Sequence, residues 1–133
     1  MNKKFIFKSE KEWKELLSSA EFHILREKGT EAPFSGKYVY NKEKGLYVCK
    51  GCGNELFSSE NKFDSGTGWP SFWEVISLSK VELKPDNSYG MKRIEVLCSK
   101  CGSHIGHLFD DGPKPNGKRY CINSVALSFK KNK

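Results

Sequence analysis

The chain has 133 residues and a mass of 15.2 kDa, a length that suits one domain and allows a buried core. The formal net charge is +7, but the basic residues form no arginine-rich cluster, so nucleic acid is not the expected partner. No apolar run reaches membrane-spanning length, and the three apolar residues after Lys4 are too few for a signal peptide. We therefore expect a cytoplasmic protein without membrane contact.

Two short helices are expected at the N-terminus. The segment Ser9–Glu12 (SEKE) has the pattern of a capping box, and apolar residues follow it at helical spacing. Ser19 could cap a second helix that ends near Gly29. The sequence thus predicts one domain over residues 1–133, with a helical extension at about 9–29 and a β core at about 37–130.

The β core begins with a predicted hairpin. The apolar segments 38–40 and 46–48 flank a polar turn, and the second of them leads directly into Cys49. Such short strands, separated by turn residues, favour a mainly β domain with antiparallel pairing.

Two further segments extend this pattern. Residues 80–83 and 91–97 flank a turn and predict a second hairpin, which ends at Cys98. Residues 119–129 are expected to form one long final strand.

Four of the five cysteines form two C-x-x-C pairs, Cys49 with Cys52 and Cys98 with Cys101. Each pair follows a predicted strand and precedes a glycine, which permits the tight turn that lets two thiolates face one metal ion. Because forty-five residues separate the two pairs, one structural Zn²⁺ would clamp two distant hairpins. A redox-active C-x-x-C is the alternative, although it normally requires a βαβ context that this sequence lacks.

The fifth cysteine, Cys121, lies alone on the final strand. Alternation places Arg119, Cys121 and Asn123 on one strand face, whose apolar far end is expected to point into the core. The positive charge of Arg119 would favour the thiolate, which makes Cys121 a candidate nucleophile. A buried, inert cysteine is the alternative.

Five other residues could accompany Cys121. His104 and His107 have a spacing that could bind metal, but four cysteines already supply a full cage, and a histidine near Cys121 could instead transfer a proton. The pair 110–111 (DD) could orient that imidazole, although DDGP is also an ordinary turn sequence. Trp69, held extended before a proline, could belong to the aromatic core or form an aromatic wall for a small apolar group.

Three segments resemble the signatures of the B-type methionine sulfoxide reductases, which act on the R-sulfoxide: Gly66–Phe72 (GTGWPSF), Gly106–Pro113 (GHLFDDGP) and Arg119–Ser124 (RYCINS). The segment 28–36 (KGTEAPFSG) is similar to the N-terminal region of that family. The resemblance implies a small antiparallel β-tent, barrel-like in outline, with short N-terminal helices and a Cys₄ zinc site. It also implies repair of oxidised proteins by reduction of peptide-bound methionine-R-sulfoxide, and leaves open whether free methionine sulfoxide is a substrate.

The same resemblance implies roles for the reacting residues. The thiolate of Cys121 would attack the sulfoxide sulfur, and Cys121 would be left as a sulfenic acid. His107 would protonate the departing oxygen. His104 and Asn123 would hold water and substrate.

The resemblance also implies roles for the surrounding residues. Arg119 would favour the thiolate, and Asp111 would set the imidazole network. Trp69 and Phe109 would bind the substrate, with the indole against the S-methyl group.

Thr67 departs from the family pattern. Many members have a cysteine at this position, which resolves the sulfenic acid as a disulfide that thioredoxin then reduces. Threonine cannot do so, and with four cysteines assigned to zinc no spare thiol remains. We therefore expect a one-cysteine cycle, in which thioredoxin or another external thiol reduces the sulfenic acid of Cys121 directly.

The main alternative is a zinc-stabilised β domain that binds nucleic acid or a peptide without catalysis. In that case Cys121→Ser would leave the function intact, whereas the reductase hypothesis predicts complete loss of turnover. A purely structural zinc domain is a third possibility, against which the co-occurrence of Trp69, His107 and Arg119 with Cys121 argues.

Overall fold

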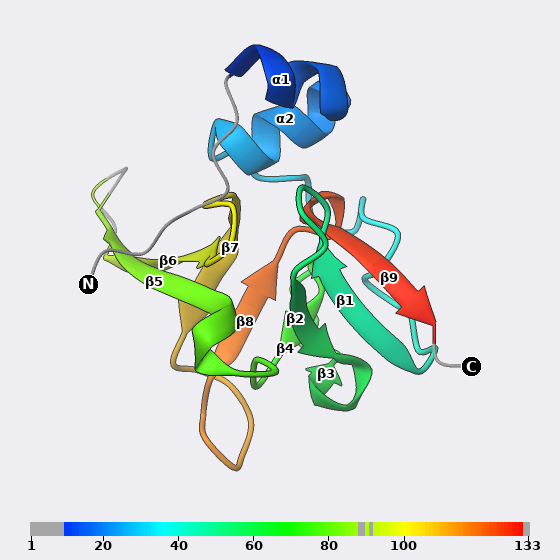
Figure 1. The fold of residues 1–133 in the computed structure, drawn as a ribbon. Coiled ribbons are helices and arrows are strands. Elements are labelled where there is room, and N and C mark those ends of the chain that lie inside the picture. The colour runs from blue at the N-terminus through cyan, green and yellow to red at the C-terminus, as the bar shows by residue number, and fades with distance from the viewer. Residues whose placement is uncertain (1–9, 88–89, 91, 132–133) are drawn as a thin grey trace.

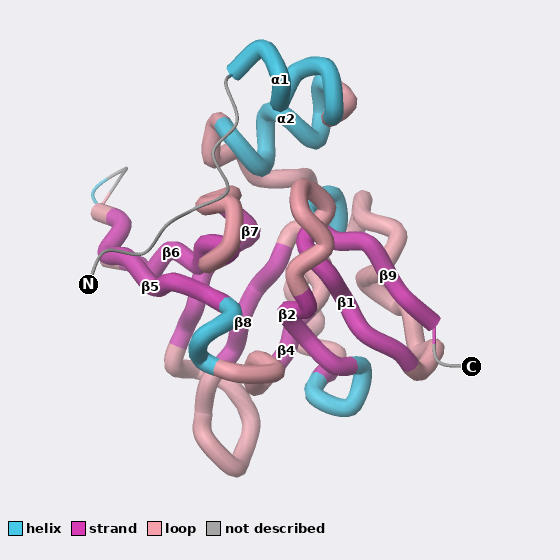
Figure 2. Tube along the Cα trace, in the orientation of Figure 1, coloured by secondary structure: helices cyan, strands magenta, loops and turns pink. Residues whose placement is uncertain are grey.

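The structure, a computed structural model, describes residues 10–87, 90 and 92–131. Two antiparallel sheets meet beneath a pair of helices (Figures 1 and 2). The smaller sheet has the order β2-β1-β9, formed by Glu55–Ser58, Gly45–Cys49 and Leu127–Lys131. The larger has the order β3-β4-β8-β7-β6-β5, formed by Lys62–Phe63, Ser71–Phe72, Arg119–Ile122, His104–Phe109, Arg93–Cys98 and Val81–Asp86. The prediction of a mainly β, antiparallel domain with short N-terminal helices is confirmed.

The helices are α1 (Glu10–Leu16) and α2 (Ser19–Arg26). Ser9, at which the first capping box was predicted, lies outside the described residues. The cap of α2 is Ser18 rather than the predicted Ser19: its hydroxyl accepts from the backbone N–H of Glu21, and the Glu21 carboxylate accepts from the N–H of Ser18. The three-residue spacing of this capping box fixes the start of α2.

The first predicted hairpin is wrong in its first arm. Residues 38–40 form a turn, and Tyr38 packs edge-on against Tyr47 with ring centroids 5.6 Å apart. Strand β1 pairs instead with β9 and with β2, which lies beyond the first cysteine pair. The second hairpin is confirmed as β5 and β6, paired from Val81 opposite Cys98 to Asp86 opposite Arg93.

The predicted long final strand is broken in two. The chain leaves the larger sheet after β8, makes one 3₁₀ turn at Ser124–Ala126 and enters the smaller sheet as β9. Alternation therefore holds only along β8, where Tyr120 and Ile122 are fully buried and Cys121 lies on the other face. Because the chain passes from one sheet to the other at this turn, the predicted apolar strand face does not continue beyond Asn123.

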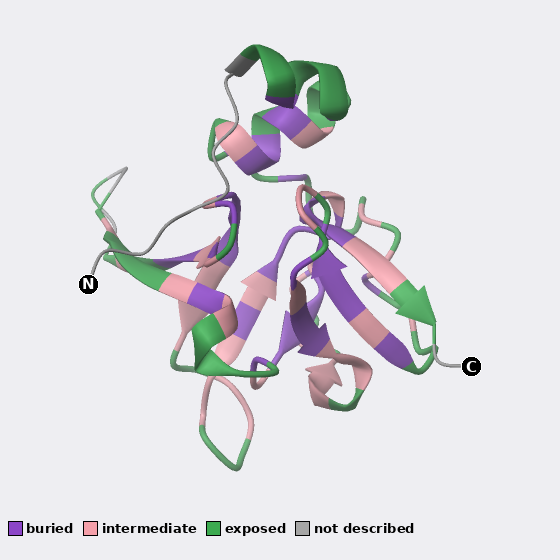
Figure 3. Cartoon of the chain, in the orientation of Figure 1, coloured by how far each residue is buried: buried purple, intermediate pink, exposed green. Residues whose placement is uncertain are grey.

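The hydrophobic core fills the space between the two sheets and the helices (Figure 3). Its centre is aromatic: the rings of Phe57 and Phe72 stack 4.3 Å apart, and Tyr47 and Tyr120 pack around them. Trp13 and Leu25 close it from the helical end. No helix within the described ranges has the length and apolar character needed to cross a membrane.

Candidate active site and metal centre

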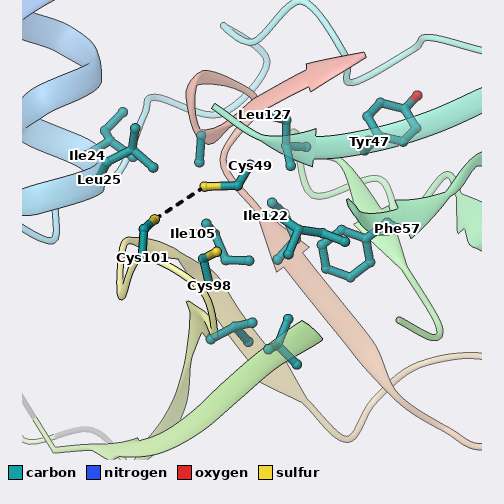
Figure 4. Packing of buried hydrophobic residues seen from close by; sticks show 14 of the residues in the cluster. Ile24, Leu25, Tyr47, Cys49, Phe57, Cys98, Cys101, Ile105, Ile122 and Leu127 are labelled. Atoms are coloured by element: carbon teal, nitrogen blue, oxygen red, sulfur yellow. Dashed lines mark hydrogen bonds between the residues drawn. The ribbon is translucent and has the colours of Figure 1, made fainter. Parts of the chain in front are cut away.

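The four paired cysteines come together at the junction of the two sheets. Their Sγ atoms all lie within 4.8 Å of one another, with 3.7 Å between Cys49 and Cys101 (Figure 4) and 3.5 Å between Cys52 and Cys98. A tetrahedral ion with metal–sulfur bonds of about 2.3 Å requires S···S separations of about 3.8 Å. The cluster therefore has the size of a four-thiolate metal site.

Each pair forms the turn of a hairpin. The first joins β1 to β2 and the second joins β6 to β7, so the cluster ties the smaller sheet to the larger. As expected, the glycine after each pair has positive φ, +80° at Gly53 and +76° at Gly102, and their N–H groups donate back to Cys49 and Cys98. Hydrogen bonding to Cys101 and burial raise the pKa of the Cys49 thiol, so the crowded sulfurs need a cation before all can ionise.

The second site is a cavity of about 200 Å³ over β7 and β8. Six residues predicted from the sequence line it: Trp69, His107, Phe109, Arg119, Cys121 and Asn123. Two larger hollows, of about 310 and 330 Å³, contain none of the predicted site residues. The predicted residues therefore converge on one cavity, although His104 and Asp111 do not line it.

Cys121 lies in the middle of the larger sheet, opposite His107 on β7 and Ser71 on β4. Burial raises the pKa of its thiol to about 11, whereas the charge and hydrogen bond of Arg119, and a hydrogen bond from Thr67, lower it. The predicted effect of Arg119 has the right sign, but burial outweighs it. The protonated thiol is therefore the predominant form of Cys121 at neutral pH.

Each of the two histidines on β7 is paired with a carboxylate. The Nε2 atom of His107 lies 2.8 Å from the Asp86 carboxylate, which is also 3.4 Å from the guanidinium of Arg93. The Nδ1 atom of His104 lies 2.7 Å from Glu95, and both side chains are buried, at 3% and 1% exposure. Only His107, however, lines the cavity.

Burial lowers the pKa of His104, although its hydrogen bond to Glu95 acts in the opposite direction. The ring is therefore neutral near pH 7 and donates its Nδ1–H to the carboxylate. Its centroid is 5.3 Å from that of His107, an edge-to-face contact. The His104 ring thus packs against the His107 ring. The Nε2 atom of His104 has no hydrogen-bond partner among the described residues.

Asp111 contacts Arg119 rather than an imidazole, which corrects the expectation that it sets the imidazole network. Its two oxygens accept from Nε and Nη2 of Arg119 at 2.8 and 3.1 Å. The reason is topological: β7 ends at Phe109, directly opposite Arg119, so Asp111 lies beyond the strand and beside the start of β8. The guanidinium also lies over the Phe109 ring, 4.5 Å from its centroid. Asp111 and Phe109 together fix Arg119 next to Cys121.

The opposite wall of the cavity is held by the backbone of Glu31. The indole N–H of Trp69 donates to the Glu31 carbonyl at 3.0 Å, and the Glu31 N–H donates to the Asn123 side chain at 3.1 Å. The Glu31 carboxylate, itself buried, accepts from the N–H of Val125 at 2.9 Å. One N-terminal residue therefore links Trp69 to the end of β8.

Thr67 belongs to a short chain of hydroxyl groups beside Cys121. The Ser65 hydroxyl lies 2.7 Å from the hydroxyls of both Thr67 and Ser71. Thr67 and Cys121 both line the cavity, and the Thr67 side chain lowers the pKa of the Cys121 thiol. The position of the family's resolving cysteine is thus occupied by a hydroxyl in the same cavity as the candidate nucleophile.

Sequence reasoning missed the carboxylates behind both histidines, Asp86 and Glu95, and the role of Glu31. Glu95 carried little signal, because alternation places it on the strand face opposite Ile94 and Val96, whereas in the structure its side chain is buried. Asp86 carried none, because it was assigned to the turn of the second hairpin and its contact with His107 spans an intervening strand.

Comparison with known proteins agrees with this geometry. The SelR domain matches residues 17–131. "Peptide methionine sulfoxide reductase MsrB" of Methanosarcina barkeri is 65% identical over 130 residues, which cover 98% of this chain and 92% of that protein. "Methionine-R-sulfoxide reductase B3, mitochondrial" of Mus musculus is 54% identical over 128 residues, 96% of this chain and 50% of the mouse protein. "Peptide methionine sulfoxide reductase MsrB" of Leptospira interrogans is 52% identical over 124 residues, covering 93% and 95%. These matches confirm the resemblance carried by the three motifs, and the chain belongs to the SelR family of B-type methionine sulfoxide reductases.

Proposed function

We propose that this chain reduces the R epimer of methionine sulfoxide in peptides and proteins, and so repairs oxidised methionine, with Cys121 as the nucleophile. The observation that carries the proposal is the placement of Cys121 directly opposite His107 in a cavity that also contains Trp69. Oxidised polypeptides are therefore the proposed partners, with no role for nucleic acid or membrane. Residues 1–133 act as one domain.

The proposed reductase step transfers one oxygen atom between two sulfurs. The sulfoxide S–O bond breaks, a bond between Cys121 Sγ and oxygen forms, and the thiol proton finishes on that oxygen as the sulfenic acid. The cysteine sulfur loses two electrons and the methionine sulfur gains them. Arg119 supports the thiolate, and Asn123 helps to hold the sulfoxide and its water.

Trp69 and Phe109 provide the apolar surfaces of the cavity. The indole face is suited to the S-methyl group, because a buried methyl against an aromatic ring gains apolar contact without requiring a hydrogen bond. Polar groups, by contrast, concentrate around Cys121 and His107. This division between an apolar wall and a polar floor would orient one sulfoxide epimer with its oxygen toward the imidazole.

We assign Zn²⁺ as the ion held by Cys49, Cys52, Cys98 and Cys101. Four thiolates in a tetrahedral arrangement are typical of structural zinc, which leaves no open position for chemistry. Zinc would offset half of the charge of the crowded thiolates and fasten the two sheets together. The cavity residues would then perform the reaction without direct help from the metal.

The regeneration step requires thiols from outside the chain. Since the other four cysteines are committed to the metal, two equivalents of a thiol, thioredoxin or another, convert the sulfenic acid back to the thiol and yield a disulfide and water. Thr67 offers no sulfur for an internal disulfide. A thiolate-bound metal and a thiol-driven cycle both suit the reducing cytoplasm, which we propose as the location.

The test is a reduction assay on separated R and S epimers of a peptidyl methionine sulfoxide, with a small dithiol as reductant. Wild type should turn over the R epimer, and Cys121→Ser should show no turnover while retaining its fold. Turnover of the S epimer alone, or an active Cys121→Ser variant, would overturn the proposal. Peptide binding without any turnover would favour the binding-module alternative.

A further inference from the structure

We infer that Asp86 is the positioning residue of the reaction: it holds His107 by Nε2, so that Nδ1 is the nitrogen presented to Cys121 and the sulfoxide. This assignment rests on the proposed function. It replaces Asp111, which the sequence had favoured for this role and which the structure pairs with Arg119.

The sheet brings Asp86 to His107 across an intervening strand. Asp86 ends β5, the edge strand, and faces Arg93 on β6, while the neighbouring Ile94 and Glu95 of β6 face Leu108 and His107 of β7. The carboxylate thus reaches diagonally over β6 to the imidazole. The contact is 2.8 Å long, and the two side chains are only 16% and 12% exposed.

Arg93 makes this arrangement more selective. Its guanidinium lies 3.4 Å from the same Asp86 oxygen that contacts His107, and Arg93 also lines the cavity. The guanidinium carries only donors, so the Asp86 oxygen accepts from it, and a carboxylate can likewise only accept from the imidazole. The ring nitrogen that faces Asp86 must therefore be the one that carries the proton.

The consequence is a fixed tautomer. A neutral imidazole with its proton on Nε2 has a lone pair on Nδ1, the nitrogen that remains for the cavity. Nδ1 can accept the proton of the Cys121 thiol on the opposite strand. The resulting imidazolium, stabilised by Asp86, then donates the same proton to the sulfoxide oxygen. No proton is gained or lost over this sequence, which matches the balance of the reductase step.

The second histidine–carboxylate pair does not compete for this role. His104 and Glu95 are both buried and neither lines the cavity. Moreover, His104 faces its carboxylate, Glu95, with Nδ1, whereas His107 faces Asp86 with Nε2. The two pairs would therefore hold opposite tautomers, which a single experiment can distinguish.

The first part of the test is kinetic. Asp86→Ala should lower kcat on the R-sulfoxide by about 100-fold, the scale of general acid–base catalysis, and leave KM within about twofold. Asp86→Asn should fall between Asp86→Ala and wild type, since an amide oxygen can still accept from Nε2–H but cannot stabilise the imidazolium. Glu60→Gln, which removes an exposed carboxylate outside the cavity lining, is the matched control and should retain wild-type kcat.

The second part does not depend on activity. Long-range ¹H–¹⁵N correlation spectra in mildly alkaline buffer report which nitrogen of each ring is protonated, and the chain has only three histidines to assign. Wild type should show the proton of His107 on Nε2 and that of His104 on Nδ1. Asp86→Ala should change the His107 pattern alone.

A His107 proton on Nδ1 in wild type would overturn the inference, as would an Asp86→Ala variant with unchanged kcat. A fall in kcat with an unchanged His107 tautomer would also refute it, since the residue would then have only a structural role. If wild type reduces no R-sulfoxide, the proposed function fails, and the spectra still decide whether Asp86 positions His107.

Discussion

The cysteine cluster and the Cys121 cavity are both built around β-strands that meet edge to edge, but they place sulfur in opposite settings. In the cluster, four thiols lie within 4.8 Å of one another, at the turns of two hairpins from different sheets. In the cavity, one thiol faces an imidazole, a guanidinium and a hydroxyl. Crowded thiolates repel one another and need a metal ion, whereas a solitary thiol flanked by proton-transfer groups can react. In our proposal, sulfur therefore serves as a metal ligand in the cluster and as the nucleophile in the cavity.

The largest effect should follow from breaking the cluster. Cys98→Ala should abolish metal binding and unfold most of the protein, because a structural zinc site contributes about 10–16 kcal/mol and the whole domain is stable by about 5–15 kcal/mol. Metal content and circular dichroism would measure both consequences. Cys121→Ser is the control and should keep one metal ion per chain and the wild-type melting temperature. A folded, metal-free Cys98→Ala variant would show that the cluster is not a clamp.

The next effect concerns the apolar wall. Trp69→Ala should lower kcat/KM for the R-sulfoxide by about 10- to 200-fold, the range that apolar contacts of this kind give. Trp73→Ala, which removes a tryptophan outside the cavity lining, should leave kcat/KM nearly unchanged when assayed well below its melting temperature. Equal losses in the two variants would mean that Trp69 acts through stability and not through the substrate.

A smaller effect concerns the guanidinium beside Cys121. Because the thiol pKa is raised to about 11, alkylation of wild type should accelerate about tenfold per pH unit above neutrality and level off near pH 11. Arg119→Leu should shift this profile to higher pH and slow alkylation about tenfold at a given pH. Peptide mapping would confirm that Cys121 carries the label. Lys118→Leu, which removes a neighbouring positive charge, is the control. An unchanged pH profile in Arg119→Leu would show that Arg119 does not stabilise the Cys121 thiolate.

The smallest effect is expected at Thr67. Thr67→Val removes the hydroxyl that lowers the pKa of Cys121 and keeps the side-chain volume, so it should slow alkylation by about two- to fivefold, the scale of one modest hydrogen bond. Ser59→Ala, a hydroxyl deletion remote from the cavity, provides the comparison. If the Thr67→Val variant alkylates faster than wild type, the hydroxyl does not stabilise the thiolate.

Local patterns predicted the parts of the fold that depend on neighbours in the chain. The hairpin of β5 and β6 follows from two apolar segments around a turn, and the two cysteine knuckles follow from C-x-x-C-G. Strand pairings between segments far apart in the sequence were not predicted. Nothing local indicates that residues 38–40 pack as a turn, or that the chain changes sheets after Asn123, because both depend on which sheet has a free edge.

The site shows the same division. Residues on one strand or its immediate partner, such as Arg119, Cys121 and His107, were predicted from alternation and from the family motifs. The carboxylate partner of His107 was not, because DDGP lies next to the histidines in sequence while Asp86 lies next to His107 in space. Contacts that cross an intervening strand have no signature in a single sequence.

The most direct test of the division between scaffold and reagent is an intact-mass measurement after one turnover of the R-sulfoxide without reductant, followed by peptide mapping and native mass spectrometry. We predict one added oxygen atom, located on Cys121, with the metal still bound to the other four cysteines. Loss of two hydrogens would report an internal disulfide and contradict the account, as would oxygen on any paired cysteine or release of the metal.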